Sequence, residues 1–364
     1  MTKQTPEAQE YIFAESRNRA ELLEDPRKNT LLNQFRLLFA EMRPREWTKN
    51  LLLLAGLLFS GRLFYEASVI RAIVAFAAFC FASSAVYIMN DFVDIHRDRV
   101  HPVKRMRPLA SGKLSPVAAK IGLAANALLA FALALTLYLL PLGVEQNSTI
   151  LHIFSISLNI HSGAPMITGD PYSAFGGSNT LFLLFLAVYL ALQVLYTFAL
   201  KHIILLDIFT IAAGFALRAY EGAIAVAAPI SPWLYVCALL LALFLGFGKR
   251  RSELVSLNES AALHRPLLKQ YSLPMIDQFI GVITAAMIMA YSLYTFEGGI
   301  MRDQRMMLTI PAVIYGLFRY MYLTNMRGQG GSPADVLLRD RHIQGAIFVW
   351  LLVIFYLLYF APVN

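Results

Sequence analysis

Acidic side chains are concentrated in a short stretch, residues 86–98, that begins at the end of a long apolar segment. If the helix continues past Asn90, a step of about 100° per residue places Asn90, Asp94 and Asp98 within about 80° of arc. Asp91 falls just outside that row. Carboxylates that face one way repel one another unless a cation lies between them, and oxygen-only ligands favour Mg²⁺ that bridges to a phosphate. The stretch therefore predicts a Mg²⁺ site with Asp91, Asp94 and Asp98 as ligands.

Basic residues follow this acidic stretch directly. Lys104 and Arg107-Pro108 come next, before Ser111-Gly112. Arginine suits bidentate contact with a phosphate, and lysine acts as a point charge. We expect Lys104 and Arg107 to hold the phosphate charge that the metal leaves unbalanced.

The composition is that of a membrane protein. Hydrophobic residues make up 58% of the 364 residues, charged residues make up 15%, and the mean hydropathy is +0.57. Such values lie far outside the range of soluble domains. Apolar runs of about 20 residues, the length needed to cross hydrocarbon, occur at 49–66, 69–90, 117–140, 179–199, 203–227, 231–248, 276–296, 307–325 and 343–361. We therefore predict an all-α, polytopic bundle of nine transmembrane helices in a lipid bilayer, with no nucleic acid as partner.

The remaining segments set the expected domain organisation. Residues 1–40 are polar, begin without a basic-then-apolar signal pattern and are interpreted as a cytoplasmic tail. Residues 41–364 form one predicted catalytic domain, which is interrupted by a long outer loop at 141–177. Cys80 and Cys237 fall inside predicted spans, and two such residues do not indicate a disulfide framework or a metal cage.

The distribution of basic residues predicts the orientation, because cytoplasmic loops of membrane proteins carry an excess of Lys and Arg. With the N-terminus inside, the inner segments 1–49, 91–116, 249–275 and 326–342 hold nine, six, five and three such residues. The outer side holds Arg62, Arg71, Arg302 and Arg305. This orientation predicts a catalytic cavity on the cytoplasmic side of the membrane. A basic inner face also accounts for most of the net charge of +8 without any substrate.

Charged residues also enter the fifth predicted span. Asp207, Arg218 and Glu221 lie within about 60° of one another on a helix, in line with Gly214. Charges at such depth are costly unless they are paired or face water, so they mark a cavity or a functional pathway. Arg218 either pairs with Glu221 between helices or faces a substrate, and the sequence leaves both alternatives open.

These motifs resemble a known family. The pattern Asn90-Asp91-x-x-Asp94-x-x-x-Asp98, with Lys104, Arg107-Pro108 and Ser111-Gly112 after it, is similar to the first aspartate motif of the UbiA-type intramembrane prenyltransferases, a nine-helix superfamily. Tyr196-x-x-x-Leu200-Lys201-x-x-x-x-x-Asp207 resembles the second motif of the branch that transfers phosphoribose to polyprenyl phosphate. Three further pieces are similar to that branch: Arg43-Pro44-x-x-Trp47-x-Lys49-Asn50, Gly214-Phe215-x-Leu217-Arg218-Ala219 and Gly248-Lys249-Arg250-Arg251-x-Glu253. The resemblance begins near residue 40 and does not extend to the tail or to the loop 141–177.

The resemblance implies a Mg²⁺-dependent enzyme that transfers 5-phosphoribose from phosphoribosyl pyrophosphate to polyprenyl (decaprenyl) phosphate and releases diphosphate. The product would be a step toward a lipid-linked arabinose donor for the cell envelope. The implied catalytic residues are Asp91, Asp94, Asp98, Lys201 and Asp207. The implied substrate-binding residues are Asn90, Lys49, Lys104, Arg107, Tyr196, Arg218, Lys249, Arg250 and Arg251.

The charge balance favours this branch over two alternatives. A prenyl diphosphate with a neutral aromatic acceptor would leave Lys201 and the run Lys249-Arg250-Arg251 with too little anionic charge to bind. An aromatic prenyltransferase nevertheless keeps the fold and the first motif, and the other alternative is a transporter or Mg²⁺ channel lined by the three aspartates. Arg250 and Arg251 are the predicted 5-phosphate clamp, or else anchors of a basic inner face. The sequence leaves the polyprenyl length and the oligomeric state open, a homo-oligomer included.

Overall fold

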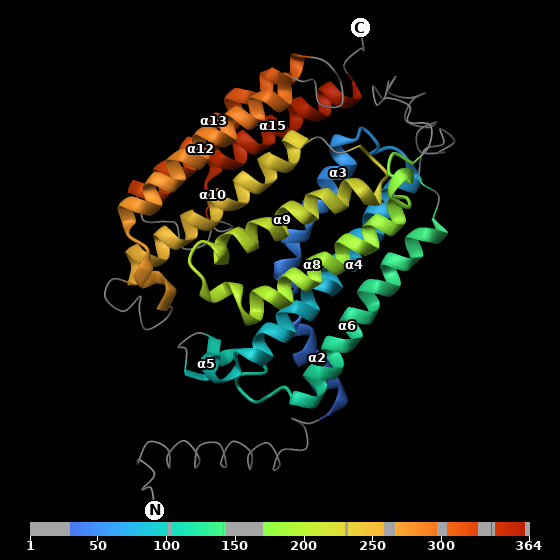
Figure 1. The fold of residues 1–364 in the computed structure, drawn as a ribbon, viewed down its shortest axis with the longest axis vertical. Coiled ribbons are helices and arrows are strands. Elements are labelled where there is room, and N and C mark those ends of the chain that lie inside the picture. Colours follow the sequence, from blue (N-terminus) through green and yellow to red (C-terminus); the bar gives the residue numbers. More distant parts are fainter. Residues whose placement is uncertain are drawn as a thin grey trace, which may run out of the picture. The chain divides into compact units, whose positions relative to one another are not determined.

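The structure of the protein is a computed structural model, and it describes residues 30–100, 104–140, 142, 170–229, 232–257, 266–296, 304–326, 336 and 339–360. These residues form helices and their connections, without a strand. Eight helices among them are long and apolar enough to cross a membrane. They are built on Glu66–Val93 (α4), Pro116–Thr136 (α6), Ser178–Phe198 (α8), Leu206–Ala225 (α9), Pro232–Leu257 (α10), Leu273–Phe296 (α12), Ile310–Met326 (α13) and Arg341–Tyr359 (α15), as drawn in Figure 1. The predicted all-α membrane fold is confirmed.

The first of the nine expected spans, residues 49–66, is not one long helix. The chain forms a 3-10 helix, Pro44–Leu53, which is followed by the short helix α3, Leu54–Phe59. At Gly61 the backbone takes a φ of 70°, a value that favours glycine, and the helical stretch has ended there. The count of nine transmembrane helices is therefore not confirmed in the part of the chain that the structure describes.

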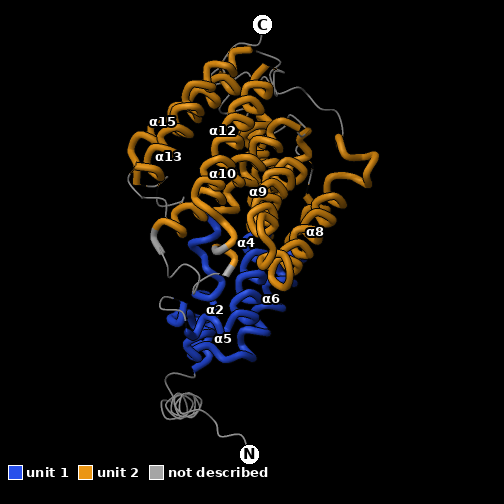
Figure 2. The backbone as a smooth tube through the Cα atoms, turned by 60° about the vertical axis from the view of Figure 1, so that its left-hand side comes forward, with its two compact units in different colours: residues 1–48, 79–131 blue, residues 49–78, 132–364 orange. Residues whose placement is uncertain are grey.

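The chain divides into two compact units, which Figure 2 shows in different colours. Unit 1 comprises residues 1–48 and 79–131, and unit 2 comprises residues 49–78 and 132–364. Helix α4 contributes its first part to unit 2 and its second part to unit 1. The single catalytic domain expected for residues 41–364 stays a prediction.

Unit 2 consists of closely packed helices. Helix α9 packs against α8 and α10, α10 packs on α12, and α13 packs on α15, as can be followed in Figure 1. Phe244 and Phe247 of α10 and Tyr320 of α13 lie in one buried apolar cluster. Helix α3 approaches α9 closely at Gly56, where a Cβ would lie 2.3 Å from the backbone nitrogen of Ala223. These contacts fix α9 and α10, the helices that carry most of the predicted site residues of this unit.

A buried arginine ties several helix ends together in unit 2. Arg71 is fully buried in α4 and donates to the carbonyl oxygens of Leu137 (2.8 Å), Leu140 (3.1 Å) and Ala225 (2.6 Å). It also donates to Asn179 Oδ1 at 2.5 Å. Carbonyl groups at helix C-termini carry partial negative charge, so they favour a cation. Arg71 therefore has a structural role that its predicted place on the outer side did not indicate.

Unit 1 combines the second part of α4 with α6 and several short helices. The short helices are Leu31–Glu41 (α2), Ile95–Val100 (α5) and the 3-10 helix Lys104–Met106. Ile88 of α4 and Leu109 lie in the buried core of this unit, and Leu37 and Leu38 of α2 pack against it. The end of the predicted polar tail is thus a helix packed in unit 1, whereas residues 1–29 lie outside the described residues.

Candidate active site

Two of the predicted metal ligands, Asp91 and Asp98, are buried in unit 1 and converge on one cationic group. Their exposed fractions are 4% and 3%. Nη1 of Arg107 lies 2.9 Å from Asp91 Oδ1 and 2.5 Å from Asp98 Oδ2. The backbone N–H groups of Asp94 and Asp98 donate to carbonyl oxygens four residues earlier, so the helical pattern continues past Asn90 as expected. Residues seven apart on a helix differ by only about 20° in direction, so Asp91 and Asp98 point the same way. The prediction had instead grouped Asp98 with Asn90 and Asp94 and left Asp91 outside that row.

The donor set fits a hard divalent cation. Both carboxylates offer only oxygen atoms, and both already accept from a single positively charged nitrogen, so one cation can neutralise them together. Asp94, the third predicted ligand, has a side chain that is 29% exposed and lies 4.0 Å from Arg97. Within the described ranges, no group of three or more Asp, Glu, His and Cys side chains converges as a complete metal site. The structure thus brings together two of the three predicted ligands, and Asp94 as a ligand stays a prediction.

Arg43 also pairs with Asp91, although the sequence marked it only as part of a motif. Its guanidinium contacts both carboxylate oxygens of Asp91. The backbone of Arg43 has a φ of 54°, in the left-handed region, and this turn ends α2. Four residues later, Trp47 Nε1 donates to Ser84 Oγ of α4 at 3.0 Å. The segment from Arg43 to Trp47 is thereby fixed on α4 beside Asp91.

Glu41 adds a carboxyl group that no motif indicated. It is 1% exposed, and its Oε2 accepts from the backbone N–H of Leu109 at 3.4 Å. Burial and the neighbouring Asp91 raise the pKa of Glu41 to about 8, although Leu109 and Arg43 act in the opposite direction. Its Oε1 finds no donor among the described residues, and Asp91 is itself an acceptor. The raised pKa keeps Glu41 protonated at neutral pH, and in this form its hydroxyl can donate to the neighbouring Asp91.

These five residues form the acidic cluster of unit 1, which comprises Glu41, Arg43, Asp91, Asp98 and Arg107. Two further predicted residues lie beside it. Lys104 Nζ is 3.9 Å from Asp98 Oδ1, with a side chain that is 45% exposed. Asn90 precedes Asp91 in the last turn of α4 and is partly buried. The structure therefore brings Lys104 and Arg107 to two buried carboxylates, Asp91 and Asp98.

A second polar network lies in unit 2, at the start of α9. Asp207 is fully buried; its Oδ2 accepts from Arg250 Nε at 3.2 Å, and its Oδ1 accepts from the hydroxyl of Tyr271 at 3.2 Å. The same hydroxyl accepts from the backbone N–H of Leu205 at 2.9 Å, where φ is 66°. Burial raises the pKa of Tyr271 to about 12, so the hydroxyl stays protonated and donates. Arg250 Nη1 also donates to Glu253 at 2.7 Å, and Tyr271 is the member that no motif indicated.

Arg250 and Arg251 do not form a common clamp in the structure. Arg250 is 3% exposed and turns toward α9. Arg251 Nε instead pairs with Asp277 of α12 at 2.6 Å, and its Nη1 donates to the carbonyl oxygen of Thr324 at 3.1 Å. Consecutive residues on a helix point about 100° apart, which explains the divergence. The expected joint 5-phosphate clamp is therefore not met, and substrate binding by either arginine alone stays a prediction.

Arg218 is buried in unit 2 and is hydrogen-bonded on three sides. It donates from Nε to Asn50 Oδ1 at 2.9 Å, from Nη1 to the carbonyl oxygen of Gly214 at 2.9 Å, and from Nη2 to the hydroxyl of Tyr189 at 2.7 Å. Both oxygens of Glu221 lack a hydrogen-bond partner among the described residues. Arg218 and Glu221 therefore share no hydrogen bond, but Arg218 does act on Glu221 through its charge, so the pairing alternative stays open. Contact between Arg218 and a substrate stays a prediction.

Four further predicted residues lie on or beside these helices. Lys201 is partly exposed on the 3-10 helix Leu200–His202, between α8 and α9, and Lys49 and Lys249 are exposed. Tyr196, near the end of α8, lies within electrostatic range of Arg250. The structure therefore associates Tyr196 with the Asp207 network, and phosphate binding by the three lysines stays a prediction.

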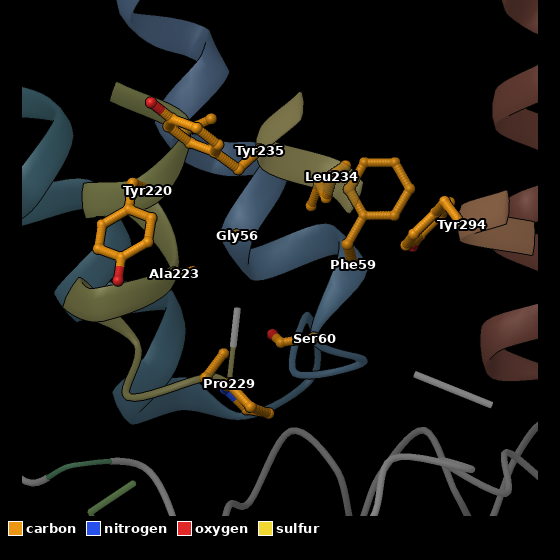
Figure 3. A pocket seen from close by; sticks show the side chains of 11 residues that line it. Gly56, Phe59, Ser60, Tyr220, Ala223, Pro229, Leu234, Tyr235 and Tyr294 are labelled. Atoms are coloured by element: carbon orange, nitrogen blue, oxygen red, sulfur yellow. The ribbon is translucent and has the colours of Figure 1, made fainter. Parts of the chain in front are cut away.

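Unit 2 also contains an apolar pocket between α3, α9, α10 and α12, which Figure 3 shows from close by. Phe59, Leu234 and Tyr294 lie together on one side of the view, and Tyr220 and Tyr235 lie on the other. The pocket holds about 470 Å³ of empty space, its open mouth included. The residues that line it include none of the predicted site residues. Such a lining suits an apolar group and not a phosphate.

Comparison with known proteins agrees with the expected resemblance. The model of the UbiA prenyltransferase family matches residues 51–146. A decaprenyl-phosphate phosphoribosyltransferase of Corynebacterium glutamicum is 31% identical, over 88% of this chain and 86% of that protein. The chain belongs to the UbiA prenyltransferase family. Another UbiA relative, the decaprenyl-phosphate phosphoribosyltransferase of Mycolicibacterium smegmatis, is 30% identical over 89% of this chain and 93% of that protein.

Solved structures of the UbiA family share the fold. A UbiA homolog from Archaeoglobus fulgidus, bound to GPP and Mg²⁺, matches with a TM-score of 0.60 at 17% identity, over 88% of this chain and 99% of that chain. A digeranylgeranylglyceryl phosphate synthase matches with a TM-score of 0.58 at 16% identity, over 89% and 98%. Membership in the UbiA family and eight apolar helices identify a multi-pass membrane enzyme, as predicted.

Proposed function

We propose that the protein transfers 5-phosphoribose from phosphoribosyl pyrophosphate to a polyprenyl phosphate, with decaprenyl phosphate as the first acceptor to test. The observation that carries this proposal is that relatives matching most of the chain are decaprenyl-phosphate phosphoribosyltransferases. The acidic cluster supports the proposal, because a diphosphate leaving group needs cationic partners. Following the excess of basic residues in the inner segments, we place the reaction at the cytoplasmic face of a bacterial plasma membrane, with the N-terminus inside.

The carboxylates of the acidic cluster are the proposed binding site for Mg²⁺. Asp91 and Asp98 would hold the ion together, with Asp94 as the third predicted ligand. When bound, the ion supplies neutralisation of the negative charge that develops on the departing diphosphate. Arg43 and Arg107 pair with carboxylates in the structure, and the diphosphate gives them an alternative anionic partner.

The proposed reaction requires no strong general base. A bond forms between an oxygen of the lipid phosphate and C1 of the ribose, while the bond from C1 to the diphosphate oxygen breaks and the diphosphate leaves with the electron pair. C1 acquires oxocarbenium character and inverts its configuration. The acceptor phosphate, with a second pKa of about 6, is already mostly dianionic at neutral pH. The reaction therefore needs groups that neutralise charge, which the acidic cluster would supply, and it does not need a histidine that acts as a base.

The residues of unit 2 have supporting roles in the proposal. Lys201 and Lys249 would bind phosphate groups as point charges. Asp207 is fully buried, so it would act by positioning Arg250 and the start of α9. The apolar pocket would accept part of an isoprenoid chain, because its lining is mainly aliphatic and aromatic.

A direct assay separates this proposal from its alternatives. Purified protein in detergent with Mg²⁺ is given labelled phosphoribosyl pyrophosphate, with and without decaprenyl phosphate. We expect label in a lipid product only when the lipid phosphate is present. Consumption of a prenyl diphosphate together with a phenolic acid would instead establish an aromatic prenyltransferase. Ion flux in vesicles without turnover would establish a channel or transporter.

A matched pair of acid-to-amide variants tests the role of the acidic cluster. Asp98→Asn removes one of the two converging carboxylates, and we expect turnover to fall by about 10²-fold or more. Glu66→Gln is the control, because Glu66 is exposed at the opposite end of α4. Folded Asp98→Asn protein with full activity would remove this residue from the reaction.

A further inference from the structure

Helix α2 presents a stripe of large apolar side chains to its surroundings. Leu31, Leu32, Phe35 and Phe39 are 90%, 69%, 67% and 48% exposed. At about 100° per residue, the four side chains cover roughly 100° of arc on one side of the helix. Four large apolar side chains on one side of an 11-residue helix mark an interaction surface. We call this set the α2 stripe.

The side of α2 next to the stripe, beyond Leu31, is occupied by contacts within unit 1. Gln34 donates to the carbonyl oxygen of Lys113 at 3.1 Å and accepts from the backbone N–H of Ser115 at 3.0 Å. Leu38 packs against Gly122 of α6, where a Cβ would lie 2.3 Å from Leu38 Cδ1. These polar and apolar contacts fix the rotation of α2 about its axis. Within the α2 stripe, Phe39 contacts the ring of Trp47 edge-on, and the greater part of the stripe remains available to another partner.

The neighbourhood of α2 is that of a membrane surface. Helix α6, which α2 contacts, is a candidate span with exposed apolar side chains such as Val117 (66%) and Ile121 (64%). In a multi-pass membrane protein such side chains face lipid. Exposed basic residues lie close to the same region: Arg36 follows Phe35 on α2, Lys113 is the residue whose carbonyl oxygen Gln34 contacts, and Lys120 lies on α6. Apolar side chains beside Lys and Arg are typical of helices that lie in the interface between lipid and water.

We propose that α2 lies in the plane of the membrane interface, with the α2 stripe buried among acyl chains and the nearby basic residues at the phosphates of the headgroups. The partner of this surface is thus the lipid bilayer. Helix α2 ends at Glu41, which contacts Asp91 and the N–H of Leu109, so the same helix joins the membrane surface to the acidic cluster. This proposal does not depend on the identity of the substrates.

Site-specific fluorescence quenching in lipid vesicles tests the proposal. An environment-sensitive probe is attached at Phe35→Cys in the full chain, in a background that carries Cys80→Ala and Cys237→Ala. The matched control carries the probe at Ala40→Cys, an exposed position of the same helix outside the α2 stripe. We expect quenchers attached to acyl chains to remove most of the emission from the probe at position 35 and little from the probe at position 40. Iodide in the water should have the reverse effect.

Three outcomes would overturn the proposal. Quenching of the probe at position 35 by iodide, and not by lipid-bound quenchers, would show that the stripe faces water. Protection from both quenchers that disappears when residues 1–29 are deleted would assign the stripe to that segment. Protection from both quenchers that disappears on dilution of the protein in lipid would assign it to a second copy of the chain.

Discussion

Replacing Glu41 by Gln should stabilise the protein at neutral and alkaline pH and have little effect at acidic pH. Glu41 is 1% exposed, lies beside Asp91 and is a protonated acid at neutral pH, which can donate to that carboxylate. A Gln amide has the same shape and pattern: its oxygen can accept from the N–H of Leu109 and its NH₂ group can donate to Asp91. The variant therefore keeps the contacts of protonated Glu41 and removes the titration.

The size of the effect follows from the pKa of Glu41. Folding raises this pKa from 4.5 to about 8. Below pH 4.5 the acid is protonated in both the folded and the unfolded chain, so it costs nothing. Between pH 4.5 and 8 the unfolded chain is ionised while the folded protein takes up a proton, and stability falls by about 1.4 kcal/mol per pH unit. At pH 7 the cost of Glu41 is about 3 kcal/mol, and Glu41→Gln removes it.

Thermal unfolding in detergent, measured from pH 4.5 to 8.5 with EDTA present, checks this prediction. The difference in Tm between Glu41→Gln and the unchanged protein should be near zero at pH 4.5, grow steadily and level off near pH 8. Glu66→Gln, which changes an exposed carboxylate on α4, is the control and should give a small difference without this trend. A Glu41→Gln difference that is the same at pH 5 and pH 8 would refute the assignment of a protonated Glu41.

Three further predictions concern packing and charge. Arg107→Gln should destabilise the protein by about 1–3 kcal/mol in EDTA, because two buried carboxylates lose their shared cation, and Mg²⁺ should raise the Tm of this variant more than that of the unchanged protein. Gly56→Ala should lower the free energy of unfolding by about 3 kcal/mol or more, since the added Cβ meets the backbone of α9. Its control, Gly281→Ala, has nothing within 4 Å of the added Cβ and should raise the free energy of unfolding by about 0.5–1 kcal/mol in the same assay. Arg218→Ala should lower the yield of folded protein severely, while Tyr189→Phe, which removes one of its partners, should cost about 1 kcal/mol.

Long apolar runs made most of the fold predictable, because a membrane span needs about 20 consecutive apolar residues. Eight of the nine predicted spans correspond to helices of the structure, with ends that differ by several residues. The first span was predicted as one helix from hydropathy alone. Hydropathy does not report the 3-10 geometry of Pro44–Leu53, nor the close approach of α3 to α9 at Gly56.

The candidate site was predictable where residues are close in sequence and not where the partner comes from elsewhere in the chain. Helical periodicity placed Asp91, Asp94 and Asp98 near one another, but it treated Asp91 as the outlier and Asp94 as central. In the structure, Asp91 and Asp98 are brought together because both accept from Arg107. The chain reaches Arg107 only after α5 and a 3-10 helix. Glu41 belongs to no motif, so only the tertiary contact with Asp91 identifies it.

The basic residues of α10 illustrate a different limit of sequence analysis. A run of three cations predicts a local positive charge, and the run Lys249-Arg250-Arg251 provides it. Whether those cations are available to a substrate depends on carboxylates that are distant in sequence. Asp207 engages Arg250, and Asp277 engages Arg251. Of the carboxylates that pair with these arginines, only Glu253 could have been predicted from the sequence, because it lies three residues after Arg250 on the same helix.

The charge balance of the acidic cluster has a consequence for how substrate and metal bind. Asp91 and Asp98 carry two negative charges, Arg43 and Arg107 carry two positive charges, and Glu41 is protonated, so the cluster is close to neutral. A divalent ion alone must compete with two arginines for the carboxylates, and a diphosphate alone must compete with two carboxylates for the arginines. When both arrive together, the carboxylates can take the metal and the arginines can take the diphosphate, so each charge keeps a partner. Under the proposed function, the cluster would therefore favour joint binding of metal and diphosphate over binding of either one alone.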